Sequence, residues 1–168
     1  MLELWDVYDE YGNRTGKVKT RSDVWGEGEF HLGASLWIVN NKGEVLMQKR
    51  ASTKRRAPDL WGNTVGSVLS GETSKQGLVR EVLEEIGITI NEDDLVFLDR
   101  HIWDNNANDN YIILYDFPIE QIILQPEEVS EVRWLSIDDL KNLIHMGVCM
   151  MNDDKGLDEI RKFIQANT

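Results

Sequence analysis

The segment Gly66–Ile88, GSVLSGETSKQGLVREVLEEIGI, joins a glycine-containing loop to a pattern typical of an amphipathic helix. Thr73 and Gln76 predict a capping box at the start of this helix, and Gly87 predicts its end. We therefore expect a helix from Ser74 to Ile86. Its apolar residues follow one flank, which should pack on the rest of the protein: Leu78, Val79, Val82 and Ile86.

Three glutamates lie on the adjoining face of the predicted helix. Glu81, Glu84 and Glu85 stand at positions i, i+3 and i+4, which places them within about a third of the circumference and away from the packed flank. Like charges at this spacing destabilise a bare helix by a few tenths of a kcal/mol per pair. A divalent cation such as Mg²⁺ prefers carboxylate oxygens and would relieve this repulsion. A solvated acidic face is the other interpretation of the pattern.

The loop before the helix favours the metal interpretation. Gly66 and Gly71 permit tight turns that expose backbone groups, and Glu72 adds a carboxylate at the helix entrance. The glycine spacing is similar to that of a P-loop, but Glu72 stands where the phosphate-binding lysine would follow. A direct phosphate cradle is therefore disfavoured, and binding of phosphate through a metal ion is favoured.

Taken together, Gly66, Glu72 and the run Arg80–Ile88 (REVLEEIGI) resemble the signature of the Nudix hydrolases, with every fixed position filled. The resemblance implies an α+β fold, a single Nudix-type α/β/α sandwich with a mixed β-sheet, formed by residues 1–168 as one domain. It also implies metal-dependent hydrolysis of a small-molecule diphosphate linked to another moiety, such as a nucleotide, with Mg²⁺ or Mn²⁺ as the cofactor.

The resemblance further assigns roles to residues of the motif. Glu81 and Glu85 would be the principal metal ligands, and Glu84 would bind the metal directly or through water. The backbone carbonyl of Gly66 or Ser67 would complete the metal shell.

The predicted catalytic residues are Glu84, Arg80 and Glu72. Arg80 would hold a glutamate, for which Glu72 is the candidate, through a charge-assisted fork of two hydrogen bonds. The signature leaves open which carboxylate orients the attacking water. A dense basic cluster ahead of the motif is predicted to bind the phosphates, although each member also fits a solvated loop: Lys49, Arg50, Lys54, Arg55 and Arg56.

The remaining sequence predicts mainly strands. Residues 2–20 should form a hairpin with a turn at Asp9–Asn13, and two C-terminal helices are expected at about 137–145 and 155–165. The other predicted strands are 31–40, 44–49, 61–65, 88–90, 95–103, 111–117 and 131–135. Such a chain suggests a mixed sheet between helices.

Two further segments are expected to be irregular. The run Asp104–Asn110 should be a turn, with a role for Asp104 and Asp109 as outer metal ligands less favoured. Residues 119–129 should form a loop, in which Glu127 or Glu128 would act as the base, as in some members of the family. Trp25 and Trp103 are the tryptophans best placed to stack on a ligand, although packing is the favoured interpretation of each.

Composition limits the partners and the location. At 168 residues the chain is about one domain long, and its net charge of −12 argues against a nucleic-acid polymer as partner. No apolar run approaches the roughly 18 residues that a membrane span needs, and the N-terminus is acidic, so no membrane contact and a cytoplasmic location are expected. The lone Cys149 excludes an internal disulfide. The resemblance also makes a homodimer possible.

Two alternatives to a hydrolase remain. The N-terminal two thirds resemble the Nudix branch that contains isopentenyl-diphosphate isomerase, but the isomerase cysteine would fall at about Gly66 and its histidine at Val68. Neither residue is present, so the hydrolase is favoured. A catalytically silent, ligand-binding Nudix domain is also disfavoured, because such a domain need not keep the carboxylate cluster.

Overall fold

The computed structural model describes residues 2–168, which form nine strands, three α-helices and two 3₁₀ turns. The elements in chain order are β1 (Trp5–Tyr8), β2 (Arg14–Lys19), β3 (Phe30–Val39), β4 (Val45–Arg50), β5 (Trp61–Gly62), β6 (Thr64–Ser67), α1 (Ser74–Ile86), η1 (Glu92–Asp94), β7 (Val96–Trp103), β8 (Asn106–Leu114), η2 (Ile119–Gln121), β9 (Val129–Leu135), α2 (Ile137–His145) and α3 (Leu157–Asn167). No helix among these residues has both the length and the apolar character needed to cross a bilayer.

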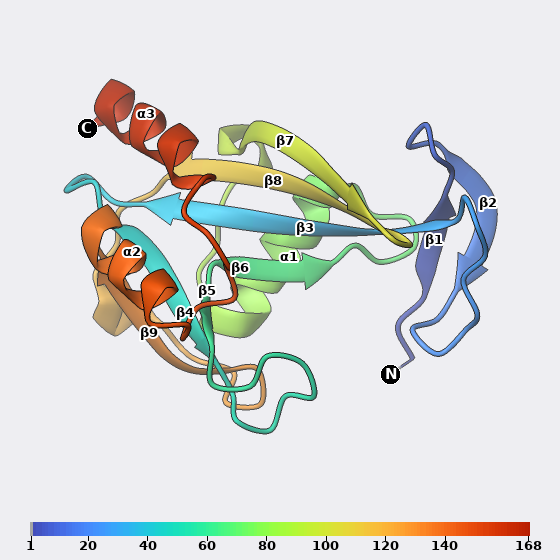
Figure 1. Ribbon diagram of the computed structural model, residues 1–168, viewed down its shortest axis with the longest axis horizontal. Helices are drawn as coiled ribbons and strands as arrows, with labels where there is room; N and C mark the ends of the chain where they lie inside the picture. Colours follow the sequence, from blue (N-terminus) through green and yellow to red (C-terminus); the bar gives the residue numbers. More distant parts are fainter. Residues whose placement is uncertain (1) are drawn as a thin grey trace.

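Strand β3 is the hub of the sheet. It pairs antiparallel with β1, β4 and β6 at different points along its ten residues, and parallel with β8 from His31 to Val39. β7 pairs with β8, and β9 and β5 pair with β4. Figure 1 shows the long strands β3, β8 and β7 side by side, with the β1–β2 hairpin at one end. The sheet is therefore mixed, as the sequence predicts.

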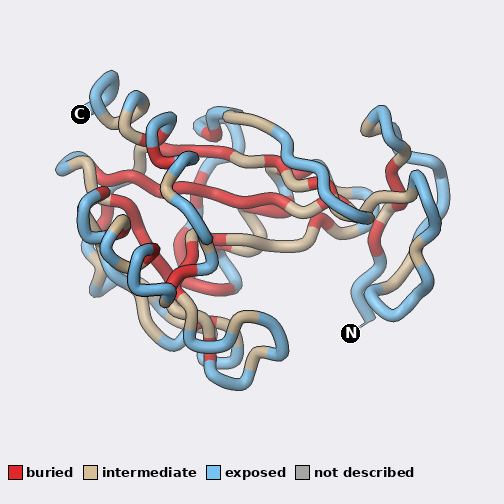
Figure 2. Tube along the Cα trace, in the orientation of Figure 1, coloured by how far each residue is buried: buried red, intermediate tan, exposed pale blue. Residues whose placement is uncertain are grey.

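Helices cover both faces of this sheet. On one face, α1 buries Leu78, Val82 and Ile86 against residues of β3 such as Ala34 and Leu36. On the other face, α2 and α3 pack on alternate residues of the same strands, including Trp37, Met47 and Ile112. Figure 2 shows the buried chain concentrated along the central strands. The predicted α+β sandwich, with helices on both sides of a mixed sheet, is confirmed.

Local signals placed the first helix correctly. The helix α1 spans Ser74–Ile86, Thr73 and Gln76 form the reciprocal capping box, and Gly87 ends the helix with φ +71°. The N-terminal hairpin turns between β1 and β2, as predicted. The helices α2 and α3 begin and end within two residues of their predicted bounds.

Two predictions of local structure are wrong. Residues 88–90 form no strand; Ile88 and Ile90 are instead buried in the core beside α1. The polar run Asp104–Asn110 is not a turn beyond Asn105, because β8 begins at Asn106 and pairs with β3. Within the sheet, Asn108 donates to Ser35 Oγ at 3.0 Å and Asn110 donates to Asp99 at 2.5 Å. Asp109 is held by Arg100 at 2.5 and 2.9 Å rather than offered to a metal.

Candidate active site

Strand β6 brings the loop of the motif against helix α1. Gly66 lies on β6 beside Ala34 of β3, and its missing side chain leaves the space that Glu81 occupies. A Cβ atom on residue 66 would lie only 2.1 Å from Glu81 Cγ and 2.4 Å from Cδ. Glycine at this position therefore allows the Glu81 carboxyl to reach the backbone of β6.

Arg80 connects the loop and the helix. Its Nε and Nη2 donate to the two carboxylate oxygens of Glu72 at 2.8 and 3.1 Å, which is the fork that the sequence predicts. Its Nη2 also donates to the Ser67 carbonyl at 2.8 Å. Its Nη1 contacts Glu81 at 2.9 Å and Glu84 at 3.2 Å. Burial opposes the Arg80 charge, but the hydrogen bond and charge of Glu72, with those of Glu81, raise the pKa of Arg80 overall.

Glu85 differs from its neighbours because it points into the protein. It is only 6% exposed, and its Oε2 atom is buried without a hydrogen-bond partner among residues 2–168. Burial, followed by the nearby charges of Glu81 and Glu128, raises the pKa of Glu85 to about 8. Burial likewise raises the pKa of Glu81. The expectation that all three glutamates point away from the packing is therefore wrong for Glu85.

The segment 119–129 approaches the same carboxylates from the other side. The amides of Ile123 and Gln125 donate to the last carbonyls of α1, those of Ile86 and Glu85, at 3.0 and 2.9 Å. Glu128 forms an ion pair with Lys54 and lies near enough to Glu85 to raise its pKa. Of the two glutamates that the sequence offered here, the structure therefore brings Glu128 to the site.

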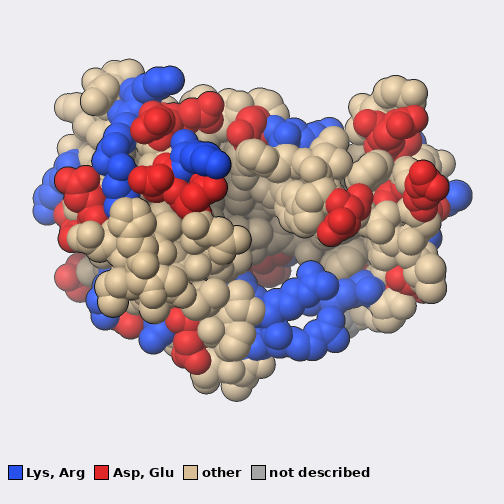
Figure 3. Space-filling model, viewed as in Figure 1, with Lys and Arg blue, Asp and Glu red and all other residues tan. Residues whose placement is uncertain are grey.

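The basic cluster is only partly gathered at the site. Arg50 and Lys54 lie close enough to Glu85 to oppose the rise of its pKa. Arg50 Nε donates to the Arg56 carbonyl at 3.2 Å, whereas Arg55 and Arg56 are exposed on the loop and Lys49 is half-buried on β4. Figure 3 shows Lys and Arg side chains along one rim of a hollow in the middle of the molecule, with an acidic side chain at its base.

The residues present fit a divalent cation, although the carboxylates do not converge on one point. No group of three or more His, Cys, Asp or Glu side chains in residues 2–168 is already arranged around a shared position. Arg80 holds Glu81 and Glu84, and the Glu84 side chain is 52% exposed. The Oε2 of Glu85 nevertheless lacks a partner among residues 2–168, and the Glu81 side chain lies against β6. Burial raises the pKa of both carboxyl groups, and together they offer the hard oxygen donors that a divalent cation prefers.

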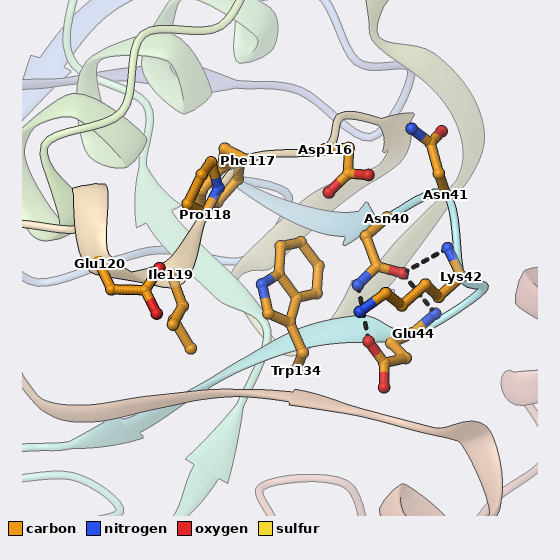
Figure 4. A pocket seen from close by; sticks show the side chains of 10 residues that line it. All are labelled: Asn40, Asn41, Lys42, Glu44, Asp116, Phe117, Pro118, Ile119, Glu120 and Trp134. Carbon is orange, nitrogen blue, oxygen red and sulfur yellow. Dashed lines mark hydrogen bonds between the residues drawn. The ribbon is translucent and has the colours of Figure 1, made fainter.

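A hollow elsewhere on the protein has the wrong charge for a diphosphate. A cavity of about 620 Å³ lies beside the turn between β3 and β4, and none of the predicted site residues lines it. Three carboxylates and one lysine surround it: Glu44, Asp116, Glu120 and Lys42. Figure 4 shows Trp134 in its wall, while the Asn40 side chain is occupied by hydrogen bonds within the turn. Net negative charge disfavours anion binding there.

We expect Gly66→Ala to reduce metal-dependent turnover by about 100-fold, since a displacement of about 1 Å at a reacting site can cost that much. The added methyl group must push the Glu81 side chain away from β6. Gly156→Ala is the matched control, because a Cβ atom at residue 156 meets nothing within 4 Å. Steady-state kinetics of both variants test this expectation, and full activity of Gly66→Ala would contradict the placement of Glu81.

The raised pKa of Glu85 predicts a pH-dependent stability in the metal-free protein. The folded chain keeps a proton on Glu85 up to pH about 8, whereas the unfolded chain releases it near 4.5. The free energy of unfolding should therefore fall as pH rises through this window, by up to about 1.4 kcal/mol per unit from this group. Urea unfolding in EDTA should show that the free energy of unfolding declines less with pH for Glu85→Gln than for the wild type. Equal declines in the two proteins would contradict the raised pKa of Glu85.

A mixed sheet between helices, with a glycine loop leading into a helix that carries clustered carboxylates, defines the class of Nudix-type proteins. The family model described as the NUDIX domain matches residues 29–149. This chain belongs to the Nudix family and is a Nudix hydrolase.

The chain is also similar to named relatives and to a solved structure. An uncharacterized Nudix hydrolase of Listeria monocytogenes is 35% identical over 147 residues, covering 87% of each chain. Isopentenyl-diphosphate Delta-isomerase 2 of Photorhabdus laumondii is 29% identical over 150 residues, covering 86% of this chain and 84% of its own. The crystal structure of DR0079 from Deinococcus radiodurans has a TM-score of 0.73 at 22% identity, covers 95% of this chain and 98% of its own, and supports the fold.

Proposed function

We propose that this protein hydrolyses the phosphoanhydride bond of a diphosphate linked to another moiety, a nucleotide or a similar group, with Mg²⁺ or Mn²⁺. The observation that carries the proposal is the buried Glu85 carboxyl, whose Oε2 has no partner although it lies beside Glu81 and within the influence of Arg50 and Lys54. A buried ionisable group without a partner is costly unless it serves a ligand.

Glu81 and Glu85 would hold the cation, with Glu84 contributing directly or through water and the backbone of Gly66 or Ser67 completing the shell. The fork between Arg80 and Glu72 supports this assignment, because it fixes the residue adjacent to Glu81 on the helix. When bound, a divalent cation neutralises diphosphate charge and makes a coordinated water more acidic.

The cations of this chain would hold the phosphate oxygens. The charges of Arg50 and Lys54 act on Glu85, so these two residues are proposed to contact the diphosphate. Lys49 would assist from β4, and Arg55 and Arg56 from the loop. Glu128 is proposed to accept the proton of the attacking water, since it is a carboxylate from outside α1 whose charge acts on Glu85. Its ion pair with Lys54 would orient it.

Metal-dependent release of phosphate or a nucleoside monophosphate tests the function. The purified protein is assayed against nucleotide sugars, dinucleotides, nucleoside triphosphates and prenyl diphosphates, with Mg²⁺, with Mn²⁺ and with EDTA. We expect at least one class to be hydrolysed with either metal and none in EDTA. Absence of hydrolysis across the panel, accompanied by ligand binding in calorimetry, would identify a silent binding domain instead.

Relatives named as isopentenyl-diphosphate isomerases make isomerisation the second candidate. The only cysteine of the chain, Cys149, is buried in the core beneath α2 and α3, beside Trp61. This placement offers no thiol beside Gly66, where the resemblance would require one. Incubation with isopentenyl diphosphate is therefore expected to give no dimethylallyl isomer, and formation of that isomer would favour the second candidate.

A pair of adjacent glutamates provides a test of the proposed base. We expect Glu128→Gln to lower kcat by about 100-fold with little change in KM, within the usual contribution of a general base. Glu127→Gln makes the same chemical change at an exposed neighbouring position and should keep full activity. Steady-state kinetics distinguish the two, and equal activity of both variants would remove Glu128 from the proton transfer.

The extent of the domain and its surroundings remain predictions. We propose that residues 1–168 form one Nudix domain, which is supported by the pairing of β1 with β3 and by the packing of α2 and α3 in the core. A cytoplasmic location, a possible homodimer, and the absence of nucleic-acid and membrane partners stay expectations from the sequence.

A further inference from the structure

The N-terminal hairpin contacts the loop that leads into α1. Both carboxylate oxygens of Asp6 on β1 accept hydrogen bonds from this loop: Ser70 Oγ donates at 2.7 Å and the Gly71 amide at 3.0 Å. The amide of Ser70 also donates to the Leu4 carbonyl at 2.7 Å. Three bonds therefore join two segments that are more than sixty positions apart in the chain.

A second side chain of the hairpin strengthens this junction. Arg14 on β2 lies 3.1 Å from the Asp6 carboxylate and donates to the Tyr8 hydroxyl at 3.2 Å. Its Nη2 also donates to the backbone carbonyl of Glu72. Asp6 and Arg14 thus hold each other while each one holds an adjacent part of the loop, and charge-assisted bonds of this kind are stronger than neutral ones.

The loop passes this constraint to the helix. The Glu72 carboxylate accepts a hydrogen bond from the Leu69 amide at 2.9 Å and the two hydrogen bonds from Arg80 described above. Arg80 in turn contacts Glu81. A continuous series of polar contacts therefore runs from the hairpin through Glu72 and Arg80 to a carboxylate of the proposed metal site.

At the tip of the loop, the hydrogen bonds that Ser70 and Gly71 donate all go to the N-terminal segment, to Asp6 and Leu4. Ser70 and Gly71 are exposed, and Gly71 adopts φ +91°, a conformation that glycine enters without penalty but that does not itself fix the chain. The hairpin lies outside residues 29–149, the part that the family model matches. The constraint on the loop thus comes from a segment beyond the matched domain.

From these contacts we propose that the β1–β2 hairpin is a positioning element of the active site, with Asp6 and Arg14 as positioning residues. They fix the loop 69–72 so that Glu72 holds Arg80, and Arg80 keeps Glu81 in place. The role in catalysis rests on the proposed function, whereas the constraint on the loop does not. Outer-shell partners of metal sites usually contribute about 10- to 100-fold to activity or metal affinity.

The test combines kinetics with amide hydrogen exchange on the full-length protein. Asp6→Ala and Arg14→Gln should each lower kcat by about 10-fold at saturating Mn²⁺, with KM for the diphosphate changed less than about twofold. In EDTA, both variants should also speed hydrogen exchange of the amides at 69–73 by about 10-fold, with unchanged exchange in β3 and β8. Asp6→Asn keeps one acceptor oxygen and should recover part of both effects.

Matched substitutions in the same hairpin serve as controls. Glu10→Gln removes an exposed charge from the turn, and Lys17→Gln removes the charge of a β2 residue that pairs with Glu29, away from the loop. Both should resemble the wild type in turnover and in exchange. Arg14→Gln tests the proposal even if Asp6→Ala fails to fold, because the Arg14 side chain is 44% exposed.

The outcomes separate this inference from the proposed function. Normal turnover in Asp6→Ala and Arg14→Gln would overturn the positioning role, whether or not loop exchange increases. Reduced turnover with unchanged loop exchange would overturn it as well, because the loop is the required intermediate. If the wild type hydrolyses no diphosphate, the proposed function fails; the exchange measurement then still decides whether Asp6 and Arg14 constrain the loop.

Discussion

Glu85→Gln is expected to reduce metal-dependent turnover by at least about 100-fold while the protein keeps its fold. The amide has the same shape as the carboxyl but carries no negative charge, so it cannot neutralise a divalent cation. Glu85 is a buried residue whose Oε2 has no hydrogen-bond partner among residues 2–168, and a bound cation would supply a partner for its ionised form. Steady-state kinetics over a range of Mg²⁺ and Mn²⁺ concentrations measure the loss.

The neighbouring glutamate provides a graded comparison. Glu84→Gln makes the same change on the same helix, but the Glu84 side chain is 52% exposed and contacts only Arg80 Nη1 among the site residues. Its effect should be smaller, and it should appear mainly as a higher metal requirement. Circular dichroism and thermal unfolding in EDTA should show both variants folded. Undiminished turnover of Glu85→Gln would refute the assignment of the metal site.

Arg80→Gln should have the second-largest effect, on both activity and stability. The guanidinium contacts three carboxylates and the Ser67 carbonyl, and its removal leaves Glu72, Glu81 and Glu84 without their shared cation. Loss of one member of a buried ion pair costs about 3 to 5 kcal/mol, and the cost should be lower here because the Arg80 and Glu72 side chains are each 23% exposed. Turnover should fall by about 100-fold, because Glu81 loses its support. Urea unfolding and steady-state kinetics measure the two effects separately.

A conservative variant tests the geometry of this contact. Arg80→Lys keeps the positive charge but cannot form the two-pronged contact with Glu72, and it therefore should recover stability more than activity. Lys75 on the same helix bonds only to the Glu92 carbonyl, so Lys75→Gln is a control for loss of a charge from α1. If Arg80→Lys were as active as the wild type, charge rather than the fork would hold the site.

The sequence predicted best what is determined locally. The bounds of α1 follow from Thr73, Gln76 and Gly87, which act within one or two turns of the helix ends. The contact between Arg80 and Glu72 likewise joins residues of one motif. The orientation of Glu85 could not be predicted in this way, because burial of a helical residue depends on how the whole helix is rotated against the sheet.

Long-range pairing explains the other errors. The composition of residues 104–110 is typical of turns, yet the parallel partner β3 supplies their backbone hydrogen bonds and Arg100 neutralises Asp109. Glu127 and Glu128 are equivalent in the sequence. The Gln125 amide donates to α1, and the Ala51 amide donates to the Glu128 carbonyl. These main-chain bonds determine which of the two glutamates lies at the site. No local pattern indicates these contacts.

The attachment of the segment 119–129 to the end of α1 has a consequence for how this region can change. Ile123 and Gln125 are held through their main-chain amides, which every amino acid except proline possesses. The exposed side chains of this stretch, such as Ile123 and Glu127, are therefore free to vary with the compound that is cleaved, while the spacing between the helix and Glu128 is preserved. Ile122 and Leu124 pack on the core and lack this freedom. Proline at either position would remove the anchor, and homologous chains that retain this chemistry should avoid it there.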